Sequence, residues 1–343
     1  MTINSIQSLR AIAALMVVFV HVSYNAGGYS ADPAIARIGY PGGLGVDIFF
    51  AISGFIMYVV VCAKDVGPGF FIIDRITRIY PLYIGCSLTL LALALMGSSV
   101  ERPSAYHFVM SLMLLPHSSG DGVHPFLDVG WTLVYEMFFY AVLATSLLVR
   151  PFHVQTLVIA LVLFVMAGLI FDPQLRALKT YSNPILLEFL SGVLLGVLWK
   201  SDVKAPAWAG LIIVVLAVTS IFSFWTGEEV GLHRFVFWGV PCAAIVAGFL
   251  CMENLAIFRS RVSLLLGASS YSIYLTHTLI LLVLGRIWKL MGTPSLPVLI
   301  VVPVIMAILV GVGCHLLVEI PMTRFLRDLI QTRRRAAAFG LRS

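Results

Sequence analysis

The stretch LVIALVLFVMAGLI, residues 157–170, carries no charged side chain, and LIIVVLAVTSIFSF, residues 211–224, is equally apolar. Neither stretch alternates polar and apolar residues as a barrel strand would. In a bilayer the backbone polar groups are satisfied only in helices or closed barrels, and about 20 apolar residues cross the hydrocarbon core as a helix. These two stretches therefore predict membrane-spanning helices.

The rest of the chain has the same character. Of its 343 residues, 60% are hydrophobic and 11% are charged, whereas a soluble domain is about 25% charged; the mean hydropathy is +1.01. The apolar runs predict about ten transmembrane helices, near 8–28, 44–63, 79–97, 129–149, 155–171, 183–199, 208–225, 235–251, 263–287 and 296–320. We therefore predict an all-α polytopic membrane protein, with a membrane domain over residues 1–323 and a basic cytoplasmic tail over 324–343.

The orientation follows from the distribution of basic residues. With the N-terminus in the cytoplasm, fifteen Lys and Arg residues lie inside and seven outside, as the positive-inside rule favours. The apolar stretch 106–115 is only about half a span long, so we interpret 105–117 as re-entrant or interfacial. Counting it as a crossing would place the Arg-rich tail outside. Both termini are therefore predicted in the cytoplasm, and residues 117–128 on the outer side.

Charge and cysteine content exclude some classes of partner. A basic inner rim that faces anionic lipid explains the net charge of +6, so we expect membrane lipid and no nucleic acid as a partner.

The five cysteines lie in or beside apolar runs, without a C-x-x-C pair or a histidine at metal-ligand spacing. They are interpreted as buried structural thiols, and no metal site is predicted.

Ionisable side chains inside predicted membrane helices are candidates for function. Arg10 and His21 are eleven residues apart on the first helix, which amounts to about 1,100° of rotation and ~16 Å, so they share a face. We expect Arg10 at the cytoplasmic edge and His21 in the outer half of the membrane. An interfacial arginine and a histidine satisfied by a neighbouring helix would explain the pair equally well.

Two carboxylates are candidates of the same kind. Asp47 opens the second helix within GGLGVDIFF, and Glu136 lies about two turns into the fourth helix, at a depth that matches His21. For Asp47 the alternative is a charge favoured by the helix dipole, and the glycines around it fit close helix packing. Glu136 must be paired, protonated or in contact with water at that depth. Trp131 lies where an outer aromatic belt would be.

Two further groups carry polar side chains. Arg75 and Arg78, three residues apart before the third helix, suit a polyanion such as the phosphates of coenzyme A, although positive-inside anchoring explains them as well. Ser270, Tyr274 and His277 form one polar stripe on the ninth helix, for which interhelical hydrogen bonding is the alternative. The remaining buried candidates are Glu188, and His315, which we expect to pair with Glu319.

In combination, several motifs resemble the acyltransferase 3 family of membrane O-acyltransferases, which modify bacterial exopolysaccharides, O-antigens and related glycans. The matching motifs are IQSLRA at 6–11 with His21, GVDIFFAISGF at 45–55, RITRIYP at 75–81, GWTLVYE at 130–136 and YSIYLTH at 271–277. The resemblance runs from residue 5 to about 320. It implies a ten-helix membrane domain that transfers an acyl group, usually acetyl, from acyl-coenzyme A to a sugar hydroxyl. No permanently bound cofactor is expected.

The resemblance also suggests roles for the candidates. A sugar hydroxyl is a poor nucleophile, so a positioned base is needed, and histidine suits that task near neutral pH. His21 is expected to be this base, with Asp47 or Glu136 orienting its imidazole. Donor binding is assigned to Arg10, Arg75 and Arg78. Substrate binding is assigned to Trp131, Tyr135, Tyr274 and His277.

Two other classes of protein remain open at this point. A secondary transporter also buries carboxylates and histidines, but it commonly has internal repeats and paired broken helices, which this sequence does not show. A non-catalytic membrane component of a polysaccharide assembly complex would leave the clustered polar residues unexplained. We therefore expect a multi-pass enzyme of the inner (plasma) membrane. Its expected partners are acyl-coenzyme A, a glycan or lipid-linked sugar, and polysaccharide assembly machinery.

Overall fold

The computed structural model describes residues 3–30, 32–63, 66–97, 100–118, 124–201, 205–224 and 231–340, excluding the side chains of 331 and 333–340. Within these ranges every regular element is a helix, which confirms the all-α prediction. The α-helices are α1 Asn4–Ser30, α2 Pro33–Gly39, α3 Leu44–Ala63, α4 Pro68–Leu95, α5 Ala105–Leu112, α6 Trp131–Ser146, α7 His153–Phe171, α8 Arg176–Tyr181, α9 Leu186–Lys200, α10 Ala207–Ser223, α11 Gly231–Arg234, α12 Val240–Cys251, α13 Arg261–Ala268, α14 Ser270–Met291, α15 Leu296–Cys314 and α16 Ile320–Gly340. The short 3-10 and π segments are η1 Tyr40–Gly43, η2 Asp128–Gly130, η3 Phe235–Gly239, η4 Ala256–Arg259 and η5 His315–Glu319.

The helices account for the predicted membrane spans. In the described ranges, nine helical stretches are long and apolar enough to cross a bilayer. The shorter apolar α10, with 17 residues, accounts for the remaining predicted span, the seventh, near 208–225. The eight residues of α5 are too few to cross, as expected for the stretch at 105–117. The orientation of the chain across the membrane, and the division at residue 323, remain predictions. Residues 119–123 of the predicted outer loop, and 341–343 of the tail, lie outside the description.

Several helix boundaries differ from the prediction. The third helix begins at Pro68 rather than near 79, because proline is well placed in a first turn and Pro81 is tolerated inside a membrane helix. The ninth predicted helix is divided at Ser269 into α13 and α14. The last helix continues through η5 into α16 as far as Gly340 instead of ending near 320. The first difference matters most, since it moves Arg75 and Arg78 from a loop into a helix.

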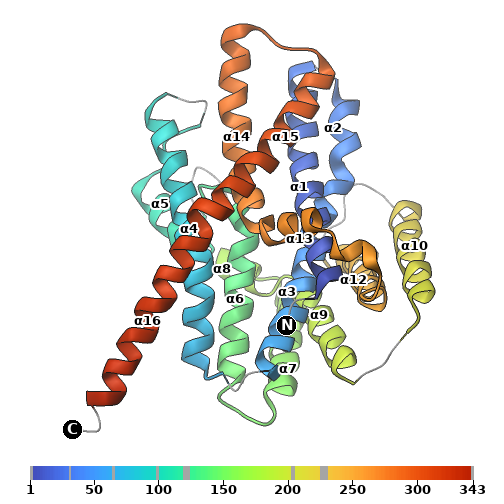
Figure 1. Cartoon of the computed structure of the whole chain (residues 1–343), viewed down its shortest axis with the longest axis vertical. Helices are drawn as coiled ribbons and strands as arrows, with labels where there is room; N and C mark the ends of the chain where they lie inside the picture. The colour runs from blue at the N-terminus through green and yellow to red at the C-terminus, as the bar shows by residue number, and fades with distance from the viewer. Residues whose placement is uncertain are drawn as a thin grey trace.

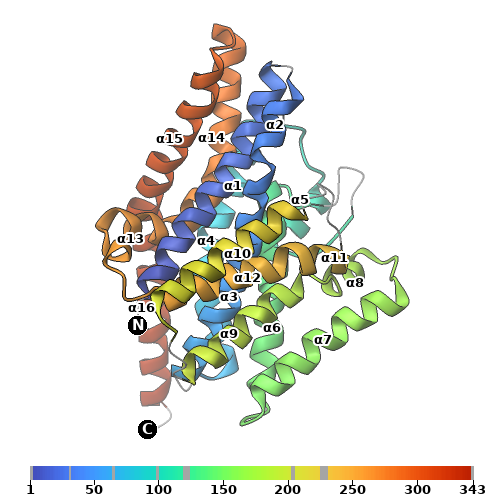
Figure 2. The same ribbon diagram turned by 90° about the vertical axis from the view of Figure 1, so that its right-hand side faces the viewer.

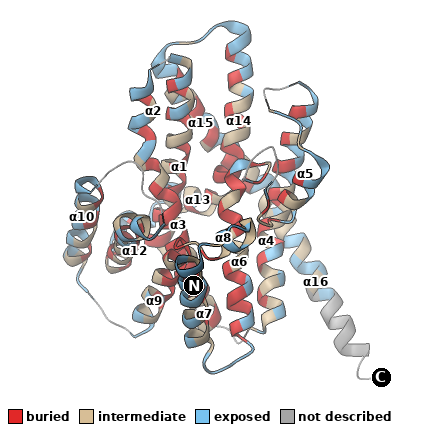
Figure 3. Cartoon of the chain, turned by 180° about the vertical axis from the view of Figure 1, so that it is seen from behind, coloured by how far each residue is buried: buried red, intermediate tan, exposed pale blue. Residues whose placement is uncertain are grey.

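The helices differ in how deeply they are buried. In Figure 1, α1, α14 and α15 reach toward one end of the molecule, and α16 projects from the other. Figure 2 shows α7 inclined at the periphery. Buried residues gather on α1, α3, α6 and α14, while α7 and α10 are mostly exposed (Figure 3). Apolar side chains on α7 such as Leu163 and Ile170, 62% and 65% exposed, are placed to face lipid.

Close packing joins α3 to α9 at two glycines. A Cβ built on Gly54 would lie 1.9 Å from the Phe189 carbonyl oxygen, and one on Gly192 would lie 1.9 Å from the Ala51 carbonyl oxygen. Each glycine therefore admits the backbone of the other helix, the arrangement by which small residues bring membrane helices together. The contact fixes the part of α3 that presents Ser53.

Gly192→Ala should destabilise the protein. The added methyl group would force α3 and α9 apart, and overpacking of this kind costs about 1–3 kcal/mol. The measurement is thermal unfolding of the purified protein in detergent, followed by tryptophan fluorescence. Gly85→Ala on α4 is the matched control, because a Cβ there meets nothing within 4 Å. Equal melting temperatures for the two variants would contradict the close α3–α9 contact.

Candidate functional site

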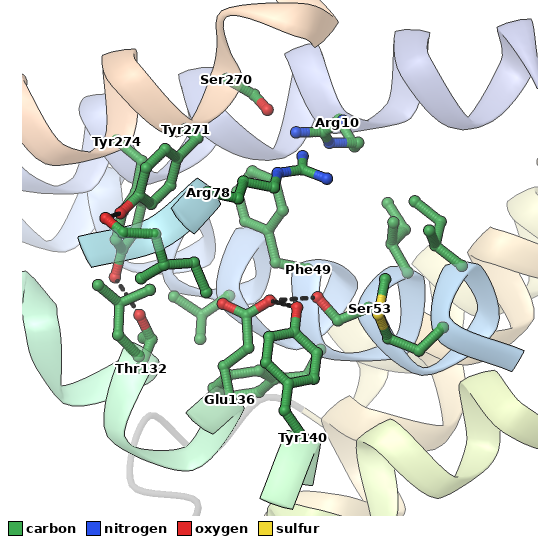
Figure 4. A pocket seen from close by; sticks show the side chains of 17 residues that line it. Arg10, Phe49, Ser53, Arg78, Thr132, Glu136, Tyr140, Ser270, Tyr271 and Tyr274 are labelled. Atoms are coloured by element: carbon green, nitrogen blue, oxygen red, sulfur yellow. Dashed lines mark hydrogen bonds between the residues drawn. The ribbon is translucent and has the colours of Figure 1, made fainter. Parts of the chain in front are cut away.

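A first cavity lies among α1, α3, α4, α6 and α14 (Figure 4). Its volume is about 100 Å³. Arg10 from α1 and Arg78 from α4 line it together with Glu136 from α6, and Figure 4 shows all three directed into it. Further polar side chains in its lining are those of Ser53, Thr132, Tyr140, Ser270, Tyr271 and Tyr274. We call this space the arginine cavity.

The arginine cavity carries an excess of positive charge. Glu136 is fixed through Oε1, which accepts a hydrogen bond from Ser53 Oγ at 3.0 Å and another from the Tyr140 hydroxyl. One carboxylate thus faces two guanidinium groups, Arg10 and Arg78, so the cavity favours an anionic ligand. Ser270 Oγ is buried and has no hydrogen-bond partner among the described residues. It can therefore bond to a ligand.

A second cavity of about 470 Å³ contains His21. Its lining combines valine and isoleucine side chains with the aromatic rings of Trp131 and Tyr135 from α6 and Trp238 from η3, and Arg234 of α11 contributes the charge. We call this space the histidine cavity. A pocket with several aromatic rings and a few polar groups suits the apolar faces and hydroxyl groups of a sugar.

The hydrogen bonds of His21 determine where its proton lies. Its Nδ1 is 2.8 Å from the Val17 carbonyl oxygen, which can only accept, so Nδ1 carries the hydrogen and Nε2 keeps a lone pair in the neutral ring. The ring of His277 lies edge-on, with 4.8 Å between centroids. His277 has the same tautomer, because its Nδ1 is 2.7 Å from the Tyr274 carbonyl oxygen. His21 therefore offers a basic nitrogen in a half-buried position.

The two cavities meet at one wall. Among the described residues, Val46 and Tyr274 are the ones that line both cavities. The Tyr274 hydroxyl is 2.8 Å from the Val129 carbonyl oxygen and 2.9 Å from Thr132 Oγ1, which ties α14 to α6 at this level. Arg10 and His21, on one face of α1, thus line two different cavities that adjoin at Val46 and Tyr274.

Asp47 does not orient His21, contrary to the prediction. It is fully buried, and its Oδ1 lies 2.7 Å from Nη2 of Arg234, whose Nη1 is 3.1 Å from Oε1 of the equally buried Glu188. Buried carboxylates need a counter-charge, and the guanidinium fork supplies one to both. The two carboxylates hold Arg234 at the histidine cavity and supply its counter-charge.

The predictions for Glu136 and Arg75 need correction too. Glu136 lines the arginine cavity and bonds to Ser53 and Tyr140, so it does not orient His21 either. Arg75 is buried, pairs with Asp74 and lies over the Phe71 ring, and it lines neither cavity. Arg75 and Arg78 lie one turn apart on α4, but Arg75 is held by Asp74 and Phe71, whereas Arg78 reaches the arginine cavity. The arginine pair is Arg10 with Arg78.

The other predicted residues divide between the two cavities. Trp131 and Tyr135 line the histidine cavity, Tyr274 belongs to the shared wall, and His277 lies behind His21 without lining either space. Separately, the predicted pair on the last helix is confirmed. His315 Nδ1 and Glu319 Oε2 are 2.8 Å apart, and that carboxylate also accepts a bond from Ser272.

The prediction missed Trp238 and two charged or ionisable residues of the histidine cavity, Arg234 and His124. Arg234 was counted among the outer loop charges because the eighth helix was predicted to begin at residue 235, one position too late to include it. His124 stacks on Trp131 and bonds through Nδ1 to Asp128 at 2.7 Å. Only its four-residue spacing from Asp128, in a loop without a helical pattern, could have indicated this pair.

Comparison with known proteins assigns the chain to a family. The profile of the acyltransferase 3 family, described as an acyltransferase domain, matches residues 3–317. The chain belongs to this family. It is therefore an acyltransferase and a multi-pass membrane protein, and its predicted resemblance is confirmed.

Individual relatives agree with this assignment. The exopolysaccharide production protein ExoZ of Rhizobium meliloti is 34% identical over 291 residues, covering 82% of this chain and 90% of ExoZ. Protein 2 in the picA locus of Rhizobium radiobacter is 32% identical over 43% of this chain and 64% of its own length. ORF330 of Acidianus two-tailed virus, named as a candidate acetyltransferase, is 26% identical over 84% of this chain and 86% of its own. No solved structure matches significantly.

Proposed function

We propose that this acyltransferase moves an acyl group, acetyl in the simplest case, from acyl-coenzyme A to a hydroxyl of a cell-surface or exopolysaccharide sugar. The observation that carries the proposal is the division of Arg10 and His21 between two cavities that share Val46 and Tyr274 as a wall. Such an arrangement separates a polyanionic donor from a sugar acceptor and lets their reacting atoms meet at one place.

The charges of the arginine cavity suit the phosphate groups of the donor. Coenzyme A carries phosphate groups, for which two guanidinium groups balanced by a single carboxylate are suitable partners. Arg10 and Arg78 hold the phosphate end, while Ser53, Tyr140 and Glu136 form a fixed hydrogen-bonded group opposite them. In this position the thioester points toward the wall shared with the histidine cavity.

The acceptor fits the histidine cavity. The rings of Trp131, Tyr135 and Trp238 offer faces for a sugar ring, and Arg234 donates hydrogen bonds to hydroxyl oxygens. Because Asp47 and Glu188 already provide counter-charges for Arg234, its site does not demand an acidic sugar. The name of ExoZ, an exopolysaccharide production protein, supports a glycan or lipid-linked sugar as the acceptor.

The reaction then follows from the tautomer of His21. Nε2 takes the proton of the sugar hydroxyl as its oxygen attacks the thioester carbonyl carbon, so a C–O bond forms. The C–S bond breaks as the tetrahedral intermediate collapses. The leaving sulfur takes the proton back from His21, which regenerates the neutral imidazole and releases coenzyme A as a thiol. No proton or electron is left over.

The orientation belongs to the same proposal. Coenzyme A is a cytosolic compound, so the Arg10 end of α1 and the basic α16 face the cytoplasm, and the histidine cavity faces the outer side of the inner (plasma) membrane. The excess of Lys and Arg on the side placed in the cytoplasm supports this orientation. Polysaccharide assembly machinery would then meet the enzyme at its outer face.

Purified protein given labelled acetyl-coenzyme A and polysaccharide should release coenzyme A and transfer the label to the polysaccharide. A secondary transporter or a non-catalytic membrane component would release none. The measurement is mass spectrometry of coenzyme A and of the glycan, with acceptor omitted as the control. Release that neither depends on the acceptor nor labels it would contradict transfer to a sugar.

A further inference from the structure

The wall between the two cavities is rigid. On α3, a Cβ at Gly45 would lie 2.4 Å from the Ala13 carbonyl oxygen, so the backbone beside Val46 rests directly on α1. On the other side, the Tyr274 hydroxyl is held by the Val129 carbonyl and Thr132. Val46 and Tyr274 are 7% and 6% exposed. These contacts hold Val46 and Tyr274 in place at the junction of the two cavities.

Other side chains close the space around the wall. Phe49 lines the arginine cavity and meets Tyr274 edge-on, with 6.1 Å between ring centroids. Phe50, one residue further on, packs against Trp131 and against Phe189 of α9. The surroundings of Val46 are therefore aromatic and closely packed.

The geometry of acyl transfer places the acyl chain at this wall. If the thiol lies in the arginine cavity and the hydroxyl in the histidine cavity, the tetrahedral intermediate has its sulfur on one side and its new oxygen on the other. Its two remaining substituents, the oxyanion and the acyl chain, must then point sideways between the cavities. There they meet Val46, Phe49 and Tyr274 rather than open space.

We propose that Val46, supported by Phe49 and Tyr274, sets the length of the transferred acyl group and restricts it to acetyl or a chain of similar size. The proposal rests on the proposed function, since it takes acyl-coenzyme A as donor and the two cavities as donor and acceptor sites. A rigid apolar pocket discriminates against one additional methylene by about tenfold or more. Neither cavity by itself would impose this limit, because a longer chain could extend within it.

The test compares the kcat/KM of coenzyme A release from acetyl-, propionyl- and butyryl-coenzyme A, with the same polysaccharide acceptor. Val46→Ala removes two methyl groups from the wall and should raise the propionyl-to-acetyl ratio at least tenfold. Val46→Ile adds a methylene and should lower that ratio. Val20→Ala is the matched control, because it makes the same change in the wall of the histidine cavity alone and should leave the ratio as it is.

The outcomes separate this proposal from the proposed function. Acetyl transfer with the same ratio in Val46→Ala, Val46→Ile and Val20→Ala would overturn the role of Val46 and leave the function standing. Equal use of acetyl- and butyryl-coenzyme A by the unmodified protein would do the same. Absence of coenzyme A release from every donor would overturn both. Val46→Ile, whose expected effect has the opposite sign, keeps the test decisive if Val46→Ala folds poorly.

Discussion

His21→Gln should lower the rate of acyl transfer by about 10²- to 10⁴-fold, the contribution of a positioned general base. Glutamine keeps a polar side chain of similar size, but its amide has no nitrogen lone pair with which to take a proton. Donor affinity should not change, because Arg10 and Arg78 line the other cavity. The measurements are the rate of coenzyme A release and the affinity for a non-hydrolysable acetyl-coenzyme A analogue.

His124→Gln is the control for this prediction. His124 lines the same cavity and bonds to Asp128, so it too could act as a base. Its side chain is 48% exposed and lies in a loop, whereas His21 is held on α1 by its bond to the Val17 carbonyl. We therefore expect a much smaller loss for His124→Gln. If this variant loses transfer and His21→Gln retains it, the base is His124, and the assignment made from α1 is wrong.

The sequence predicts the helices well and the partners of buried charges poorly. Long apolar runs place the spans because the bilayer leaves the backbone no alternative to a helix. The face shared by Arg10 and His21 follows from helix geometry alone, since both residues lie on one helix. The cavity that a residue reaches was harder to predict. Counting helical turns placed Glu136 at the same depth as His21, but in the structure Glu136 lines the arginine cavity.

Partners across helices depend on packing that no spacing encodes. Asp47 is 187 positions from Arg234 and 141 from Glu188, and the three meet only because α3, α9 and α11 pack together. Arg75 and Arg78 resemble a binding pair in sequence, but in α4 the first is buried against Asp74 and the second reaches the cavity. The residue types that carry chemistry were visible in the sequence, and their grouping into two cavities was not.

Arg78→Glu should raise the KM for the acyl-coenzyme A donor at least tenfold, equivalent to about 1.4 kcal/mol of binding. The arginine cavity would then hold one guanidinium and two carboxylates, so its net charge would change from positive to negative beside the phosphates. The KM for the polysaccharide acceptor should barely change, because no side chain of the histidine cavity is altered. The measurement is initial rates of coenzyme A release with each substrate varied in turn.

Arg259→Glu is the matched control for charge reversal. Arg259 is exposed at the end of η4, lies on the side proposed to be cytoplasmic and lines neither cavity. The variant therefore measures only how the overall surface charge affects binding of an anionic donor. Its donor KM should remain close to that of the unmodified protein, since exposed charges are screened by salt beyond about 10 Å. Equal increases in donor KM for Arg78→Glu and Arg259→Glu would show that Arg78 acts only through the general attraction of a basic surface for the donor and does not bind it in the arginine cavity. An increase in acceptor KM alone for Arg78→Glu would mean that the donor and acceptor cavities have been assigned in the wrong order.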